Sequence, residues 1–374
     1  MSLSTRLQAV FLLLTLVGCD RKFDAPDWYA GDAALGDAGS DGGPMMGPQP
    51  TGTWVNVTNN LANLPSACGN LSAIVAKPDE DLLLVGVQDT GVFYSRDGGA
   101  TWEQANLAPG GAKIPGGVVS FLFDPNDPMH WWITVIYSGQ GVYETHNNGG
   151  LLTPLGDVRH NDLLTVDFAD PEQKVMLVGS HERAQTLMRS EDSGKTWSDV
   201  GAGLPPVLSC TRPLIVNATT YLVGCSFTGD GIFRSADSGS TWTMVDGTGG
   251  VMPPLATPKS GIFWPTAAGS LMHSMDEGLT WEEVTPKHML KGLSPVLLPD
   301  GRIAALGNDG VLVSDDLGKS WKRVSVELPF EPDELTYSAQ RKAFYVRNSD
   351  CGTFVRPDAV ARYDFDWETN DGLF

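Results

Sequence analysis

The sequence predicts an all-β chain that folds as a single β-propeller of seven four-stranded blades. An eight-residue pattern, S-x-D-x-G-x-[TS]-W, occurs five times, at residues 95–102, 190–197, 235–242, 274–281 and 314–321. A short β-prone run with period-2 character precedes most copies, and another follows the Trp. The pattern recurs every 40 to 50 residues or so, which is the period of a propeller blade. The 43 Gly and 25 Pro among 374 residues agree with a turn-dense all-β chain.

Each copy of the pattern, which we call a box, is predicted to form the turn of a β-hairpin. The Asp can accept hydrogen bonds from the backbone N–H groups of the turn, and the Gly can adopt a positive φ. The Trp begins the returning strand and offers a large ring for burial. We therefore interpret ten residues as structural, with sugar stacking by the Trp residues as the alternative: Asp97, Asp192, Asp237, Asp276, Asp316, Trp102, Trp197, Trp242, Trp281 and Trp321.

Weaker copies of the pattern set the number of blades. One lies at residues 145–152, with Asn147 in place of the Asp and no Trp, and a still weaker one ends at Asp358. With the five full boxes, they give seven anchors. Residues 53–57 match the second half of a box without the first, so we expect this N-terminal strand to complete the last blade and close the ring. Residues 362–367 compete for the same place, so six or eight blades remain open.

The boxes resemble those of the Asp-box, or BNR-repeat, propellers, over roughly residues 52–367. That family includes sialidases, xyloglucanase-type glycosidases, sortilin-type receptors and a photosystem II assembly factor. The resemblance implies the propeller fold. It selects none of these functions, because the boxes are architectural and one fold hosts many activities.

The N-terminal region is predicted to direct export. Residues 1–18 have a positive start followed by an apolar run, as in a cleaved signal peptide. Residues 16–19, Leu-Val-Gly-Cys, resemble a bacterial lipobox, which implies a diacylated Cys19; an ordinary secretory signal is the alternative. Residues 19–51 read as an acidic flexible tether and residues 52–374 as the propeller. We therefore expect a lipid-anchored, extracytoplasmic protein of the bacterial cell envelope, in the periplasm or at the cell surface.

The formal charge of −20 argues against binding to nucleic acid or to anionic lipid surfaces. We expect membrane contact only through the lipid anchor, a protein or carbohydrate partner, no cofactor and a monomeric chain.

The cysteines indicate disulfides rather than a metal site. If Cys19 carries lipid, four of the five remain, an even number in an exported protein. Cys210 precedes a predicted inner strand and Cys225 ends its neighbour, so these two are expected to pair. Cys68 and Cys351 would join the two ends of the ring. Four buried thiols are the alternative, and the lack of CxxC spacing argues against metal binding by cysteine.

In propellers, the loops that enter the inner strand and the loops that join the second and third strands share one face, the usual ligand face. The polar residues expected there are Asp89, Arg159, His160, His181, Arg212, Asp230 and Asp309. The third blade is the densest, because both of its loops carry His, Arg and an acid. His160 and His181 are candidate acid–base groups or ligand donors, and a solvated polar rim is the alternative.

Catalytic residues are not selected by the sequence, although Asp162, Glu182 and Arg183 are candidates. A sialidase would need three arginines around a carboxylate, a Tyr nucleophile with a Glu, and an Asp acid. No Arg occurs in the first inner strand, residues 71–75, and no Tyr–Glu pair is evident. We therefore predict a binding or scaffolding module for protein or glycan. The alternatives are a sialidase- or xyloglucanase-like glycoside hydrolase acting on extracellular polysaccharide, and an assembly factor for a membrane complex.

Overall fold

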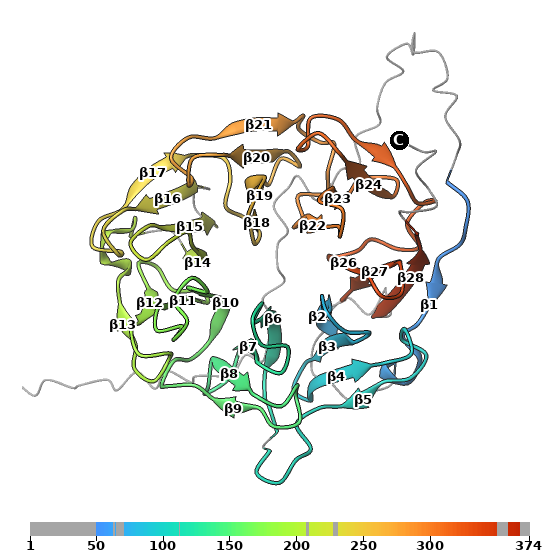
Figure 1. The fold of residues 1–374 in the computed structure, drawn as a ribbon, viewed down its shortest axis with the longest axis horizontal. Helices are drawn as coiled ribbons and strands as arrows, with labels where there is room; N and C mark the ends of the chain where they lie inside the picture. Colours follow the sequence, from blue (N-terminus) through green and yellow to red (C-terminus); the bar gives the residue numbers. More distant parts are fainter. Residues whose placement is uncertain are drawn as a thin grey trace, which may run out of the picture. The chain divides into compact units, whose positions relative to one another are not determined.

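The computed structural model describes residues 50–62, 64, 71–111, 113–206, 209–226, 231–349 and 358–366. They form seven four-stranded antiparallel sheets that follow one another around a ring (Figure 1), which confirms the predicted seven-bladed propeller. The described helices are two three-residue 3-10 turns, η2 (Asn59–Leu61) and η3 (Gly201–Gly203), and neither has the length of a membrane span.

In blades 1 to 6 the four strands follow in chain order from the centre outward (Figure 1). Blades 1 and 2 consist of β2 (Leu71–Ala76), β3 (Leu83–Val87), β4 (Gly91–Ser95), β5 (Glu103–Gln104), β6 (Gly117–Phe123), β7 (Trp131–Ile136), β8 (Val142–Thr145) and β9 (Thr153–Pro154). Blades 3 and 4 consist of β10 (Asn161–Val166), β11 (Met176–Ser180), β12 (Leu187–Ser190), β13 (Ser198–Asp199), β14 (Ser209–Ile215), β15 (Tyr221–Ser226), β16 (Gly231–Ser235) and β17 (Thr243–Asp246). Blades 5 and 6 consist of β18 (Leu255–Thr257), β19 (Gly261–Pro265), β20 (Leu271–Ser274), β21 (Glu282–Thr285), β22 (Val296–Leu297), β23 (Ile303–Leu306), β24 (Val311–Ser314) and β25 (Lys322–Arg323).

Blade 7 is completed by the N-terminal strand, as predicted. It contains β26 (Glu334–Ser338), β27 (Ala343–Asn348) and β28 (Ala359–Asp364), with β1 (Val55–Asn56) as its outer strand. Val55 pairs with Arg362, and the amide of Val57 donates to the carbonyl of Val360 at 2.8 Å. The two ends of the ring are thereby joined by backbone hydrogen bonds.

The seventh anchor, predicted at Asp358, is wrong. Asp358 precedes the third strand of blade 7, whereas the box Asp of five other blades, and Asn147 of blade 2, follow the third strand. The competing segment, residues 362–367, overlaps this third strand, β28, in which the β-formers Val360 and Tyr363 are buried, at 0% and 1% exposure. The Asp358 carboxylate instead accepts a hydrogen bond from the amide of Leu71 in blade 1, at 3.3 Å.

The core lies between neighbouring blades. Trp131 and Trp132 are adjacent in β7 and fully buried, and their side chains leave opposite faces of blade 2. Trp131 packs in a cluster with Leu84 of blade 1, and Trp132 packs in a cluster with Leu164 of blade 3. Each sheet is therefore buried on both faces, which explains the nearly continuous apolar runs of the second strands.

The boxes follow the third strands and share one hydrogen-bond pattern. In blade 1, the hydroxyl of Ser95 donates to Asp97 Oδ1 at 2.8 Å. The amide and hydroxyl of Thr101 donate to the two carboxylate oxygens of Asp97 at 2.9 and 2.6 Å. Gly99 adopts φ +90°, and a Cβ there would meet the Cβ of Val57 at 2.8 Å, so only glycine fits. The Thr101 hydroxyl, aided by its amide, lowers the pKa of Asp97 to about 2.

A disulfide joins Cys210 to Cys225 across β14 and β15, which confirms the predicted pair. The other predicted pair, Cys68–Cys351, and the lipidation site Cys19 lie outside the described residues.

Candidate functional site

Two kinds of loop meet at the ligand face. In blade 1, the amide of Asp89, after β3, donates to the carbonyl of Gly116, which leads into β6, at 2.9 Å. In blade 3, the amide of His181, after β11, donates to the carbonyl of His160, which leads into β10, at 2.8 Å. These bonds show that the loops entering the inner strands and those following the second strands share one end of the blades.

Five polar side chains gather at this end of blades 2 and 3. We call them the ligand-face cluster: Tyr137, His160, Asp162, His181 and Glu182. Tyr137 follows β7 of blade 2, and the other four belong to blade 3, around the start of β10 and the end of β11. The ring centroid of Tyr137 lies 4.9 Å from that of His160 and 5.4 Å from that of His181. The two imidazoles stand perpendicular to each other at 4.7 Å.

His181 links an acid to a phenol. Its Nδ1 lies 2.9 and 3.0 Å from the two carboxylate oxygens of Asp162, and its Nε2 lies 3.3 Å from the hydroxyl of Tyr137. A carboxylate beside Nδ1 keeps the proton on that nitrogen. The Nε2 lone pair is therefore directed at the phenol and accepts its proton as a hydrogen bond.

His160 is held neutral. Its Nδ1 accepts a hydrogen bond from the backbone amide of Tyr137 at 2.7 Å, so the ring proton must sit on Nε2. Burial, followed by the nearby His181, lowers the pKa of His160 below its ordinary value of 6.5. The cluster thus presents one protonated imidazole nitrogen, contributed by His160, and one phenol.

The backbone at this cluster adopts uncommon conformations. Tyr137, His160 and Glu182 have φ of 53°, 60° and 52°, in the left-handed region that non-glycine residues rarely occupy. Tyr137 is 60% exposed in spite of its two ring contacts and two hydrogen bonds. An exposed, positioned aromatic ring beside polar groups can stack on a sugar ring or pack against a peptide while neighbouring groups form hydrogen bonds.

Three other predicted ligand-face residues bond to groups of their own loops or blades. Asp89 accepts a hydrogen bond from the amide of Gly116 at 2.9 Å and so supports its own loop. Arg159 is 63% exposed and pairs with Asp157 at 3.1 Å. Arg212 donates to the side chains of Thr211 and Ser226 at 2.8 and 3.3 Å, within blade 4.

Two further predicted residues lie on exposed loops. Asp309 is exposed on the loop after β23 of blade 6, and Arg183 is exposed next to Glu182. Asp230 lies outside the described residues. No trio of arginines around a shared ligand position is therefore formed by the described candidates.

Tyr137 is the cluster member that sequence reasoning missed. Its signal was position, because it stands directly after β7 as His181 stands directly after β11. An aromatic residue at the same place as a candidate histidine one blade later indicates a shared site.

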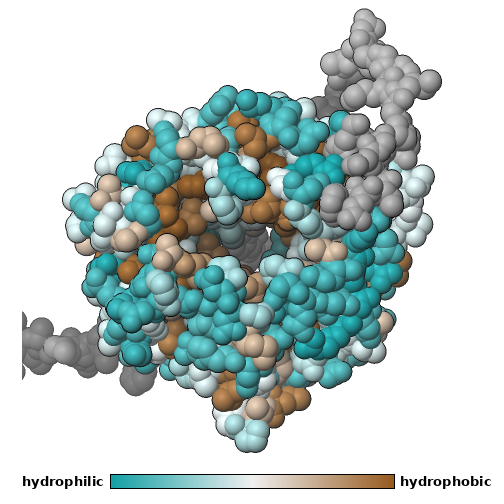
Figure 2. Space-filling model, viewed as in Figure 1, coloured by the Kyte–Doolittle hydropathy of each residue, from teal (hydrophilic) through white to brown (hydrophobic). Residues whose placement is uncertain are grey.

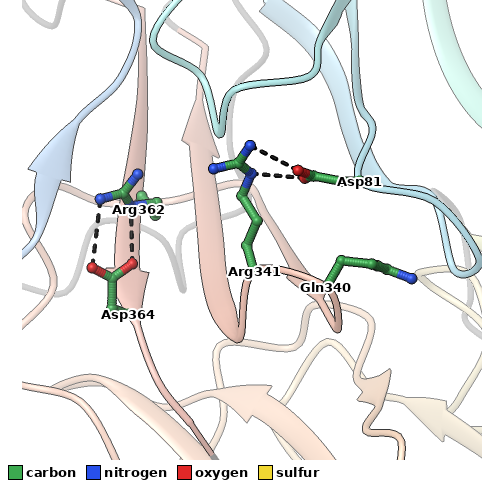
Figure 3. Close-up of a pocket in the computed structure, with 5 residues that line it drawn as sticks. All are labelled: Asp81, Gln340, Arg341, Arg362 and Asp364. Atoms are coloured by element: carbon green, nitrogen blue, oxygen red, sulfur yellow. Dashed lines mark hydrogen bonds and ion pairs between the residues drawn. The ribbon is translucent and has the colours of Figure 1, made fainter.

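A polar cavity of about 350 Å³ lies at the opposite end of the blades, where blade 7 meets blade 1 (Figure 3). The guanidinium of Arg341 donates two hydrogen bonds of 2.7 Å to Asp81, and Arg362 pairs with Asp364 at 3.0 Å. Its charges are therefore paired with one another. Because Asp81 belongs to blade 1 and Arg341 to blade 7, we interpret this cavity as part of the ring closure.

Hydrophilic residues dominate the face drawn in Figure 2, and the hydrophobic residues there form separate small groups. The exposed large apolar side chains come from several blades, among them Leu107, Tyr137, Met244 and Met275. Scattered exposed apolar residues are normal for a soluble domain, so they define no docking surface by themselves.

Comparison with known proteins agrees with this architecture. Residues 93–104 match the family model described as BNR/Asp-box repeat. The GH74 enzyme of Niastella koreensis has a TM-score of 0.56 at 13% identity, over 81% of this chain and 44% of that enzyme. This chain thus spans less than half of the enzyme's length. No curated protein matches the sequence.

Two further proteins share the fold. YCF48 from Cyanidioschyzon merolae has a TM-score of 0.53 at 15% identity, over 83% of this chain and 98% of that protein. YCF48 bound to D1 peptide gives the same TM-score and identity, over 86% and 99%. The extracellular domain of a putative hybrid two component system from B. thetaiotaomicron has a TM-score of 0.55 at 12% identity, over 84% and 40%. At such identities these likenesses show a common fold but do not establish a common function.

Proposed function

We propose that this seven-bladed Asp-box propeller is an extracytoplasmic binding module that holds a protein or glycan segment at the ligand-face cluster. The observation that carries the proposal is the exposed ring of Tyr137, fixed by His160 and His181 from the next blade. A side chain already held in one orientation loses little conformational entropy on binding, so it is a good anchor for a ligand.

The cellular location follows from independent features. The Cys210–Cys225 disulfide favours an oxidising compartment, since such bonds are rare in reducing cytosol. The signal-like residues 1–18 and the lipobox-like residues ending at Cys19 fit export followed by lipid anchoring. We therefore propose a cell-envelope protein whose propeller is tethered by residues 19–51.

A protein segment is the partner that we favour. The neighbour YCF48 is a propeller of nearly the same extent as this chain, and one of its structures has a D1 peptide bound. A cluster that offers a phenol, an imidazole N–H and carboxylates suits an extended segment with both polar and basic groups. The formal charge of −20 favours a partner of net positive charge. A role in assembling a membrane complex is one form of this function.

Capture from envelope extract tests the proposal. The full chain is immobilised beside two variants, Tyr137→Ala in the cluster and Tyr94→Ala as a matched control. Tyr94 lies in β4 of blade 1, where its hydroxyl donates to Glu103 at 2.7 Å. We expect a protein or glycan retained by the unchanged chain and by Tyr94→Ala but not by Tyr137→Ala. Equal capture by all three would place binding elsewhere.

A glycoside hydrolase is the second candidate, favoured by one observation. The Asp162–His181 pair directs a basic nitrogen at the hydroxyl of Tyr137, the arrangement that would activate a tyrosine nucleophile. Glu182 has a carboxylate oxygen 3.9 Å from His181 Nε2 and would serve as the acid. Turnover of fluorogenic glycosides, sialosides included, that disappears in Asp162→Asn and Tyr137→Phe would favour this candidate. No turnover beside an active sialidase would remove it.

A further inference from the structure

We propose that blade 2 carries a zinc site at its Asp-box end, with His130, Glu144 and His146 as ligands and Asp124 as the group that orients His130. This site lies at the opposite end of β7 from the ligand-face cluster, because His130 precedes the strand and Tyr137 follows it. It is independent of the proposed function, and it concerns residues that the sequence analysis did not select.

Strand register brings the three ligands together. In the β7–β8 pair, Trp132 faces Glu144 and Trp131 faces Thr145. One step further along the same register, His130 faces His146. Alternate residues of a strand share a face, so Glu144 and His146 project to one side of blade 2 together with His130. The two imidazole rings are stacked with their centroids 4.0 Å apart.

The ligand atoms are spaced for a small cation. Glu144 Oε2 lies 3.7 Å from His130 Nε2 and 3.6 Å from His146 Nε2. All three atoms lie within 4.8 Å of one another. Zinc–ligand bonds of about 2.0–2.1 Å at tetrahedral angles place neighbouring ligand atoms about 3.4 Å apart. The two distances to Glu144 must therefore close by a few tenths of an ångström, and the exposed His146 ring must rotate out of its stack with His130 so that its lone pair points at the ion.

The buried Nε2 of His130 has no hydrogen-bond partner among the described residues. The side chain is 11% exposed, and its other nitrogen faces Asp124 Oδ2 at 3.3 Å, so the ring proton belongs on Nδ1. Protonating Nε2 as well would not satisfy it, since Glu144 at 3.7 Å is beyond hydrogen-bond reach. A cation bound by the Nε2 lone pair satisfies this nitrogen.

Asp124 is itself held in place. Its carboxylate accepts hydrogen bonds from the Gln173 side chain at 2.5 Å and from the Asn126 amide at 2.8 Å. Gln173 comes from the neighbouring blade 3. A carboxylate that fixes the far nitrogen of a metal-binding histidine is the usual second layer of a zinc site, where it sets the tautomer and the ring orientation.

The donor set selects zinc over the hard cations. Two imidazoles with one carboxylate suit zinc, whereas magnesium and calcium prefer sites made of oxygen. His146 is 64% exposed, so an ion can reach the site from solvent and water can complete the coordination.

The second group of possible metal ligands is not suited to bind a cation. His160, His181 and Glu182 also bring their ligand atoms within 4.8 Å of one another. However, His160 Nδ1 already accepts the amide proton of Tyr137, so its Nε2 carries a hydrogen and has no lone pair for a metal. Variants of the blade 2 cluster thus test metal binding, and variants of the ligand-face cluster serve as the control.

The site would strengthen the weakest box. In blade 2 the box Asp is replaced by Asn147 and the following Thr by Leu151, so the hydroxyl–carboxylate bond of the full boxes is missing. Zinc held by His130 and His146 would tie the loop before β7 to this box. The position of His146 is never His in the five full boxes, where the residues are Arg96, Glu191, Ala236, Met275 and Asp315.

Metal-binding measurements on the untagged full chain, stripped with a chelator, test the proposal. Zinc binding is measured by competition with a chelating dye, and cobalt is added as a spectroscopic probe of the ligand set. We expect His146→Ala to weaken zinc binding more than about 100-fold and Asp124→Asn to weaken it about 10–100-fold. His181→Ala, on the opposite face, should leave the affinity unchanged. Because His146 is exposed, its variant should keep the metal-free melting temperature.

Three results would overturn the assignment. One is zinc affinity that is equal in the unchanged chain and in His146→Ala. Another is loss of binding in His181→Ala, which would move the metal to the ligand-face cluster. The third is magnesium or calcium binding as tightly as zinc. Glu144→Gln provides a further check, since it keeps the shape of the side chain but removes its charge and should also weaken zinc.

Discussion

Replacing Trp102 by Ala should loosen the ring at its closing strand. Trp102 is 3% exposed, and its indole N–H donates to the carbonyl of Val57 at 2.9 Å. Val57 follows β1, the strand that completes blade 7, so this one ring connects the box of blade 1 to the closure. Its loss leaves a cavity and a buried carbonyl without its partner.

The expected destabilisation is large for a single residue. Truncating a buried Trp to Ala costs about 3–5 kcal/mol, and the orphaned carbonyl adds about 1 kcal/mol. Trp197 is the matched control, because it is only partly buried and its indole donates within its own box, to the carbonyl of Gly194 at 2.8 Å. For Trp197→Ala we expect about 1–2 kcal/mol, in the range of an ordinary substitution.

Denaturant unfolding of the two variants, followed by far-ultraviolet circular dichroism, gives both free energies of unfolding. Hydrogen exchange at the Val57 amide, which bonds to Val360, reports on the closing strand separately. We expect faster exchange in Trp102→Ala but not in Trp197→Ala. The reasoning is refuted if the two variants unfold at the same denaturant concentration, or if the Val57 amide keeps its protection when Trp102 is removed.

Three further predictions follow from the same contacts. The pKa of Asp97 is about 2, whereas its ordinary value is 3.8. The ionised Asp97 therefore contributes its full stabilisation of the fold above about pH 4, and this stabilisation is lost as the pH falls toward 2. The melting temperature measured against pH, for the unchanged chain and for Asp97→Asn, tests this prediction. Replacing both Cys210 and Cys225 by Ser should cost about 3 kcal/mol for the opened 15-residue loop, and reductant should then lower the unfolding midpoint less than it does in the unchanged chain. The change His181→Ala should raise the pKa of His160, since it opens the ring to water and burial is the main cause of the lowered value; proton NMR titration of the imidazole would detect it, and an unchanged or lower value would contradict the assignment.

The fold was largely predictable because each box is a local structure. The bonds of Asp97 reach Ser95 and Thr101, two and four residues away, so sequence spacing alone reveals them. The closing strand was predictable for the same reason, since it copies half of a box. The last blade was misassigned around Asp358 because the local cue there is weak, and tertiary burial of Val360 decides which segment pairs.

The candidate sites were less predictable because they depend on contacts between blades and on register. Tyr137 meets His160 and His181 across 23 and 44 residues, and no spacing rule predicts that distance. His130 and His146 become neighbours only through the pairing of β7 with β8. What the sequence did indicate was that the third blade carries the densest polar loops, and two of its histidines do lie together.

Affinity for the captured partner tests the central claim most directly, namely that the ligand-face cluster is the binding site. It is measured for the unchanged chain, for Tyr137→Ala and for Arg341→Gln, which alters the paired cavity at the other end of the blades. A residue at the centre of a binding site costs about 2 kcal/mol or more when truncated, so we predict at least a tenfold loss for Tyr137→Ala and little change for Arg341→Gln. The reverse order, or no loss in either, would contradict the account.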